Sequence, residues 1–273
     1  MLSLSSKFHQ AEWQNNLTAT PDTTQWGTRL TAHATPHSKG AYATLMTTTY
    51  DVYGFWVGVS GTATTATDTD MLLDIATGAA QENIIVPEFL CGGRGPAASA
   101  APVALFQWFP IFIPRGTIVS GRIQALITVD IADVLMIANG GASAMPGPLF
   151  SGCDAYGTTV ASSSGTSHTP GNTGAESTAA NVGGTATRDY GAVALGHGIA
   201  GTAMNTLAYH FEIQLGAVTL CEYYTGVNSL ETVLGPFPPA PFHASIPFGS
   251  QLQIRGECSG IAQAQDIAFY CFY

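Results

Sequence analysis

The chain has 273 residues, only 10% of them charged, and a formal net charge of −10. This balance argues against a nucleic acid partner, because binding phosphates requires clustered Lys and Arg. The sequence also argues against a membrane-spanning segment. Its longest apolar stretch, 100–114, is interrupted by Pro102 and Pro110 and is too short to span a bilayer. Such a sparsely charged surface favours a protein that neighbouring subunits partly cover.

Residues 1–26 are polar, and they contain two isolated tryptophans, Trp13 and Trp26. They have no apolar core of the kind that a secretion signal carries. We expect an extended N-terminal arm that docks on a neighbour in an assembly, with the two tryptophans as its anchors.

Short apolar runs bounded by Gly, Thr, Asp or Pro predict β-strands along the rest of the chain. They lie at 55–59, 71–75, 84–86, 109–113, 119–129 and 134–138. No segment keeps a helical apolar period for more than about two turns, so helices should be few and short. The Gly- and Pro-rich segment 139–156 indicates a linker between two domains, 27–138 and 157–273. Ser-, Thr- and Gly-rich residues 158–187 predict long loops and one weak strand.

The end of the chain repeats its middle. Residues 109–133 align with 242–266 at a constant offset of 133, with six identities in 25 positions. The identical pairs are Phe109 and Phe242, Ile113 and Ile246, Pro114 and Pro247, Gly116 and Gly249, Arg122 and Arg255, and Asp133 and Asp266. A duplicated module predicts two similar β-sandwich domains in tandem. The alternative is that a chain rich in Gly, Ala and Thr aligns with itself by chance.

The repeated Ile-Pro-x-Gly element suits a strand end, because proline cannot donate to a ladder and glycine permits the turn. A strand with one arginine follows each copy of the element, and an aspartate lies 11 residues after each arginine. We interpret Arg122 with Asp133, and Arg255 with Asp266, as ion pairs across a hairpin that serve structure rather than ligand binding.

No motif supplies a catalytic set: GxSxG, HExxH and Walker A are missing, and no GxGxxG follows one of the predicted strands. Pro36 separates His33 from His37 and breaks the helix that a metal pair would need. Asp68, Asp70 and Asp74 lack the glycine and glutamate of a calcium loop, which favours a solvated turn before a strand. We therefore expect no enzyme, no cofactor and no metal ion.

Two further sets of residues have structural interpretations. His210 and Glu212 alternate along one strand, so they should share a face of a sandwich exterior. The five cysteines, an odd number without CxxC spacing, predict buried thiols in a reducing environment rather than disulfides or a zinc site.

The segment 71–79 (MLLDIATGA), followed by Val86-Pro87 and the duplicated Ile-Pro-x-Gly block, resembles a group of tailed-phage virion proteins. The resemblance covers about residues 50–125 and is echoed in 190–255. It implies an all-β fold of two tandem jelly-roll-like antiparallel sandwiches. It also implies a structural component of the virion, most simply a capsid decoration (cement) protein or a vertex or head-spike protein.

Such a protein would form a homo-oligomer, a trimer or a pentamer, and would contact the major capsid protein or other virion proteins. Its location would be the virion, assembled in the host cytoplasm. The chain departs from the pattern in having two domains, where decoration proteins often have one. The alternative is a tail or spike adsorption protein that binds a host surface glycan through Tyr and Trp platforms and the loops of 158–187.

Overall fold

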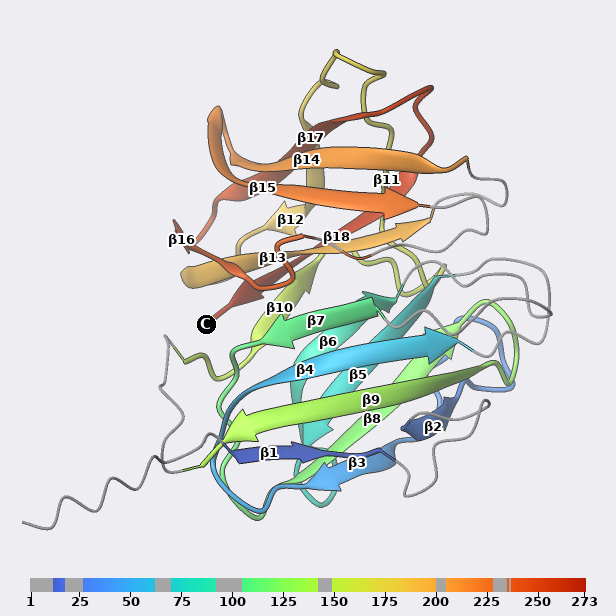
Figure 1. The fold of residues 1–273 in the computed structure, drawn as a ribbon, viewed down its shortest axis with the longest axis vertical. Helices are drawn as coiled ribbons and strands as arrows, with labels where there is room; N and C mark the ends of the chain where they lie inside the picture. The colour runs from blue at the N-terminus through green and yellow to red at the C-terminus, as the bar shows by residue number, and fades with distance from the viewer. Residues whose placement is uncertain are drawn as a thin grey trace, which may run out of the picture.

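The computed structural model describes residues 12–17, 27–61, 70–91, 105–141, 149–199, 205–227, 235 and 237–273. Within these residues the secondary structure consists of 18 β-strands, without a helix. The strands form two β-sandwiches stacked one above the other in Figure 1. We call residues 12–141 unit 1 and residues 149–273 unit 2.

The strands of unit 1 are β1 Glu12–Asn15, β2 Thr28–Thr31, β3 Ala43–Thr47, β4 Val52–Gly61, β5 Met71–Thr77, β6 Asn83–Cys91, β7 Leu105–Phe109, β8 Ile118–Ala125 and β9 Ile131–Gly140. The strands of unit 2 are β10 Cys153–Tyr156, β11 Thr166–His168, β12 Ala180–Thr185, β13 Tyr190–Ile199, β14 Leu207–Leu215, β15 Val218–Val227, β16 Phe242–Ile246, β17 Gln251–Cys258 and β18 Gln265–Phe272.

The two units have the same topology. One sheet of unit 1 has the order β1-β9-β4-β7, with β2 also on β9, and the other has the order β3-β8-β5-β6. Adding nine to every label gives the sheets of unit 2: β10-β18-β13-β16, with β11 on β18, and β12-β17-β14-β15. The strands within each sheet are antiparallel, and each unit is a jelly-roll-like sandwich. The predicted all-β class is confirmed, and the origin of the two units by duplication stays a prediction.

The repeated Ile-Pro-x-Gly block makes the same turn in both units. Gly116 and Gly249 adopt φ values of 79° and 77°, which glycine enters without steric cost. The amide of Gly116 donates to the carbonyl of Thr48, and that of Gly249 donates to the carbonyl of Ala186, each at 2.8 Å. The block therefore fixes how each edge strand, β7 or β16, passes into the opposite sheet.

The two prolines of the block lie at exposed positions, but their surroundings differ in detail. Pro247 directly follows Ile246, the last residue of β16, whereas Pro114 follows β7 only after a short segment of isolated bridges. The carbonyl of Pro247 accepts from the amide of Ser250 within its own turn at 3.1 Å. The carbonyl of Pro114 instead accepts from the hydroxyl of Thr48 at 2.7 Å. The repeat thus preserves the course of the backbone and not each of its hydrogen bonds.

The predicted ion pairs Arg122–Asp133 and Arg255–Asp266 are wrong. The reason is topological: β8 and β9 are consecutive in the chain but lie in different sheets, and so do β17 and β18. Each arginine therefore lies on the opposite sheet of the sandwich from its expected aspartate partner. Asp133 instead pairs with Arg29 of β2, its register neighbour, at 2.9 Å between Nε and Oδ1.

Each arginine pairs with a carboxylate on the central strand of its own sheet. Arg122 lies opposite Asp74 and reaches its Oδ2 at 2.8 Å, and Arg255 lies opposite Glu212 and reaches its Oε2 at 2.8 Å. Both units therefore carry an acid–arginine pair at the same position of the fold.

The boundaries of the predicted arm and linker also change. Residues 12–15 form β1 on β9, and the side chain of Asn16 accepts from the amide of Met136 at 2.7 Å. Trp13 is on that strand and 57% exposed, whereas Trp26 lies outside the described residues. Of the predicted linker 139–156, the first two residues belong to β9 and the last four are β10.

Unit 2 packs on the edge of unit 1 through the outer face of its β13 and β18. Tyr270 and Phe272 of β18 are fully buried in the hydrophobic core that also contains Phe109 and Phe89 of unit 1. The hydroxyl of Tyr270 accepts from the amide of Leu90 at 2.6 Å. We call this contact the seam, and it joins the two sandwiches into one block.

Candidate functional site

At the seam, the side of unit 1 between its edge strands β6 and β7 is closed by unit 2. The ring of Phe109 on β7 is completely buried and lies 6.4 Å from the ring of Tyr270 and 6.2 Å from that of Phe272. The outer face of β13 contributes small side chains here, Ala192 and Ala194, which allow β6 to approach closely. An apolar sheet face of one sandwich thus covers the open side of the other.

Among the described residues, no second sandwich covers the corresponding side of unit 2, between β15 and β16. Phe242 of β16, the repeat partner of Phe109, is 42% exposed. Tyr224 of β15 and Phe237, which pair through both backbone hydrogen bonds, are 53% and 70% exposed. We call Tyr224, Phe237 and Phe242 the open edge of unit 2. Exposed large aromatics at an edge are typical of contact surfaces.

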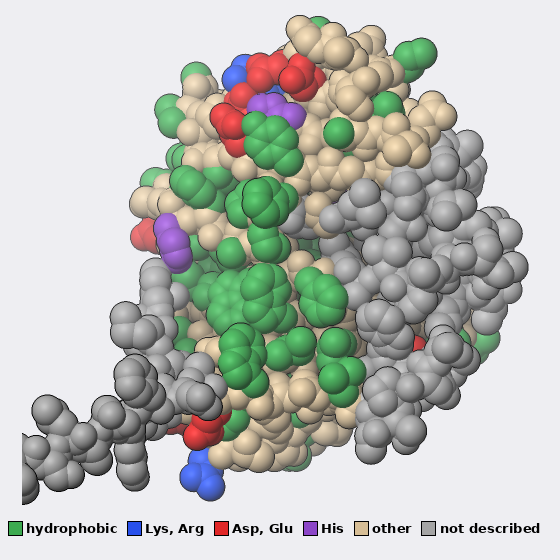
Figure 2. Space-filling view, in the orientation of Figure 1, with side chains coloured by type: hydrophobic (Ala, Val, Ile, Leu, Met, Phe, Trp, Pro, Cys, Tyr) green, Lys and Arg blue, Asp and Glu red, His purple; other side chains and the backbone are tan. Residues whose placement is uncertain are grey.

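A second apolar surface lies on the outside of unit 1. Figure 2 shows hydrophobic side chains gathered over β4 and β7. Trp56, Phe106, Trp108 and Ile137 project from β4, β7 and β9 on this side and are partly exposed; we call them the aromatic face. The rings of Trp56 and Trp108 are cross-strand neighbours 5.4 Å apart.

Glycines on β4 allow the rings of the aromatic face to lie against the sheet. A Cβ added at Gly54 would collide with the ring of Trp108, and one at Gly58 with the ring of Phe106. The alternation of glycine with bulky residues in β4 is therefore a packing requirement of this face. The sequence indicated the strand but not the surface, although Gly54-Phe55-Trp56-Val57-Gly58 carries the pattern.

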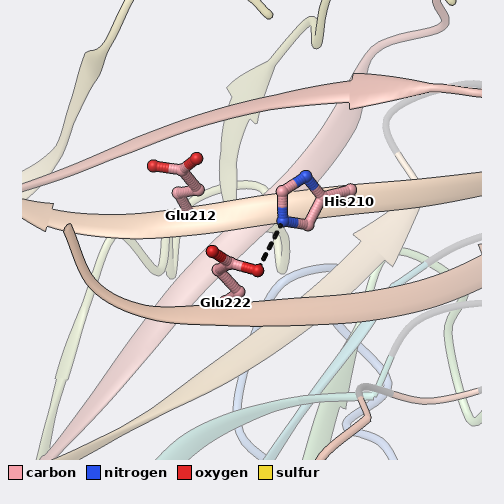
Figure 3. A group of neighbouring side chains, drawn as sticks. All are labelled: His210, Glu212 and Glu222. Atoms are coloured by element: carbon pink, nitrogen blue, oxygen red, sulfur yellow. Dashed lines mark ion pairs between the residues drawn. The ribbon is translucent and has the colours of Figure 1, made fainter.

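The described residues contain one group whose side chains are arranged as metal ligands. His210 and Glu212 of β14 and Glu222 of β15 offer ligand atoms within 4.8 Å of one another, and Figure 3 shows the three side chains together on the β14–β15 pair. The predicted shared face of His210 and Glu212 is confirmed. His210 Nε2 is 3.3 Å from Glu222 Oε2, and its ring stacks on Tyr224 at 4.7 Å.

The charge of Glu212 is already balanced without an ion. Burial raises the pKa of this carboxyl, but hydrogen bonds from Thr219 and Arg255 outweigh it and bring the pKa down to about 2. Thr219 Oγ1 donates at 2.6 Å, and Gln214 Nε2 donates at 3.2 Å. With the guanidinium of Arg255 on the same oxygen, this group has the chemistry of an ion-pair network rather than of a metal centre.

Two carboxyl groups meet at the seam, one from each unit. Asp70, immediately before β5, is buried and accepts from the amide of Ile199 at 3.0 Å, while its Oδ2 has no hydrogen-bond donor among the described residues. Asp266 of β18 lies beside it. Burial, and then the neighbouring carboxyl of Asp266, hold the pKa of Asp70 well above its usual value; burial also raises the pKa of Asp266. The pair therefore favours a protonated state.

Other candidates from the sequence are structural. His33 accepts from the amide of Thr35 at 2.9 Å, and His37 contacts Ser163 of unit 2 at 3.0 Å, so the two histidines serve separate loops. Asp74 is 2% exposed within β5 and not in a solvated turn, and Asp68 lies outside the described residues. The prediction of buried free thiols is confirmed for Cys91, Cys153, Cys221, Cys258 and Cys271.

The fold and these surfaces together define a protein of two tandem jelly-roll-like β-sandwiches with exposed apolar surfaces, the aromatic face and the open edge. Neither a family model nor a curated protein matches the chain. The solved structure of PNGF-II is similar over 96% of this chain and 64% of that chain, at 7% identity and a TM-score of 0.31. The chain thus spans 64% of that structure, and this weak likeness carries no argument about function. In the part of the chain that the structure describes, no helix has the length and apolarity needed to cross a membrane.

Proposed function

We propose that the chain is a structural component of a phage virion, a capsid decoration (cement) protein or a vertex or head-spike protein that acts through subunit contacts. The observation that carries the proposal is the combination of one fused block of two jelly-roll-like sandwiches with an aromatic face and an open edge that remain uncovered. Jelly-roll sandwiches recur among viral capsid proteins.

The surface chemistry supports a role in assembly. Only 10% of the residues are charged, so a free monomer has few groups that favour solubility over association. Trp and Tyr, which the aromatic face and the open edge both offer, are the residues that dominate binding energy at protein interfaces. A standard interface buries about 1,600 Å² in total, and repetition over many copies multiplies its effect.

The expected partners are further copies of the chain around a three-fold or five-fold axis, together with the major capsid protein or other virion proteins. The expected location is the virion, after assembly in the host cytoplasm. The test is direct: mass spectrometry of purified particles should detect the chain at a fixed stoichiometry, and purified protein should bind emptied capsids. Particles that lack the chain, with no binding to emptied capsids, would refute the proposal.

The second candidate is a tail or spike protein that binds a host surface glycan. It is favoured by the exposed tryptophan pair Trp56 and Trp108, since aromatic rings stack on sugars. A sugar site also needs polar groups that fix orientation, whereas the neighbours of this pair include Phe106 and Ile137. A glycan array separates the two candidates: glycan binding that Trp56→Ala abolishes would favour the adsorption protein.

A further inference from the structure

The seam shows what covers the open side of a unit in this protein. In unit 1 the opening beside Phe109 is closed by the outer face of β13 and β18, from which Tyr270 and Phe272 contact the ring. This contact buries all three rings completely and places them in one continuous core with unit 1. It is therefore the packing that closes this opening in unit 1.

The open edge of unit 2 is the counterpart of the covered opening of unit 1. Phe109 lies opposite Phe55 on the neighbouring strand, and Phe242 lies opposite Val193, so both phenylalanines hold the same place on their edge strands. Phe109 is 0% exposed, and Phe242 is 42% exposed. The difference is that no described segment covers Phe242 as unit 2 covers Phe109.

The aromatic face is likewise the counterpart of the face that unit 2 presents at the seam. In unit 2, Ala194 of β13 lies opposite Tyr270 of β18, four residues after Asp266. In unit 1, Trp56 of β4 lies opposite Ile137 of β9, four residues after Asp133. The residues of unit 2 are fully buried by unit 1, whereas Trp56 and Ile137 remain partly exposed.

Among the described residues, the opening of unit 2 and the sheet face of unit 1 are therefore both uncovered. They adjoin within one molecule, since the amide of Trp108 donates to the carbonyl of Pro239 at 3.0 Å. We propose that the open edge of unit 2 packs on the aromatic face of a second copy of this chain, and so repeats between molecules the contact that joins the units within one. The proposal deepens the proposed function, on which it rests, by naming the partner and both surfaces. Because the two surfaces differ, the contact is heterologous, and copies add head to tail into a ring where the rotation closes.

The test uses single charge substitutions on either surface of the full chain. Trp56→Glu places a carboxylate on the aromatic face, and Phe242→Glu places one on the open edge, so each should convert the wild-type oligomer to a monomer in sedimentation velocity. Phe248→Glu is the matched control, because Phe248 is 70% exposed in the turn after β16, outside both surfaces. It should sediment as the wild type does.

Mixing the two variants identifies the geometry. Trp56→Glu retains its open edge and Phe242→Glu retains its aromatic face, so an equimolar mixture has one intact pair of surfaces and should form a dimer with one copy of each. Circular dichroism and thermal melting check that both variants are folded. Phe237→Glu, on the same edge and 70% exposed, replaces Phe242→Glu if that variant unfolds.

Three outcomes would overturn the inference. They are a wild type that stays monomeric at all accessible concentrations, an edge variant that associates as the wild type does, and a mixture without the dimer. Failure here is distinct from failure of the proposed function. Particles that contain the chain would still support the virion role when the variants have no effect. A reciprocal pattern in solution would support the self-contact even if particles lacked the chain.

Discussion

At the scale of single residues, His197 gives the fold a defined response to acid. It is fully buried in the core of unit 2, where its ring nitrogens contact Thr225 Oγ1 at 2.9 Å and Gln265 Oε1 at 2.7 Å. Burial lowers its pKa from 6.5 to about 4. The folded state thus favours the neutral ring, and this stability is complete above pH 6.5 and is lost as the pH falls towards 4.

The expected loss between pH 7.5 and pH 4 is about 3 kcal/mol, because each tenfold difference in proton affinity between the folded and unfolded states contributes about 1.36 kcal/mol. Urea unfolding at several pH values measures it. His197→Gln keeps a side chain that can hydrogen-bond but not titrate, so its stability should vary less over this range. An unchanged pH slope in the variant would show that other groups dominate.

The carboxyl groups of Asp70 and Asp266 at the seam respond to pH in the direction opposite to that of His197. The pKa values of Asp70 and Asp266 are raised in the folded state, mainly by burial, so their contribution is most favourable at low pH and declines as the pH rises above the usual aspartate range. Asp70→Asn removes one negative charge and allows the amide to donate to Asp266. We expect this variant to be more stable than the wild type at pH 7.5, with the gain shrinking at pH 4. Asp189→Asn, in an exposed turn, is the control.

At the scale of elements, the acid–arginine pair is a shared feature of the central strands. Asp74 is 2% exposed, and it also binds Lys39 at 2.9 Å and accepts from the amide of Glu88. Arg122→Met leaves this buried carboxylate short of one charged partner and should cost about 2 kcal/mol in the free energy of unfolding. Arg188→Met breaks a more exposed pair with Asp154 and should cost less than about 1 kcal/mol. Equal losses in denaturant unfolding would contradict this ranking.

The sequence predicted most strands of unit 1 but paired their side chains wrongly. The predicted strand 109–113 overlaps β7 only at Phe109, and 158–187 holds two strands, β11 and β12, instead of one. Apolar runs, Pro and Gly mark where strands begin and end, because these are local effects of the backbone. They do not tell whether consecutive strands such as β8 and β9 form a hairpin or cross to opposite sheets. For this reason Asp74 and Glu212, the true partners of Arg122 and Arg255, were not identified.

At the scale of the whole molecule, the seam was missed although the sequence contained a signal for it. Residues 267–272 are apolar at every position, and a strand with one face in solvent alternates instead. Such a run indicates burial on both sides, and all six residues are fully buried. The strands of the aromatic face carry the same signal in the apolar runs 55–57 and 134–138, although Trp56 and Ile137 are partly exposed. The strands of the open edge, β15 and β16, carry no such run, so the sequence did not indicate that surface.

The continuous core across the seam predicts that the two units unfold together. Ile75 of β5 and Ile213 of β14 hold equivalent positions in the two units, and both are completely buried. Ile75→Ala and Ile213→Ala should each cost about 3 kcal/mol, because each leaves a cavity in its core. In a single cooperative transition, either substitution moves the entire heat-absorption peak down by roughly 6 °C or more.

Differential scanning calorimetry distinguishes this result from independent units, for which each substitution would shift only one of two components. The wild type should show one peak whose calorimetric and van't Hoff enthalpies agree. Tyr270→Phe adds a test of the seam itself, since loss of its hydroxyl leaves the buried amide of Leu90 without its partner and should cost about 1–3 kcal/mol. If that variant lowers the midpoint while the peak stays single, the seam is part of the cooperative core. A split into two peaks would show instead that unit 1 and unit 2 are held together by little more than this contact.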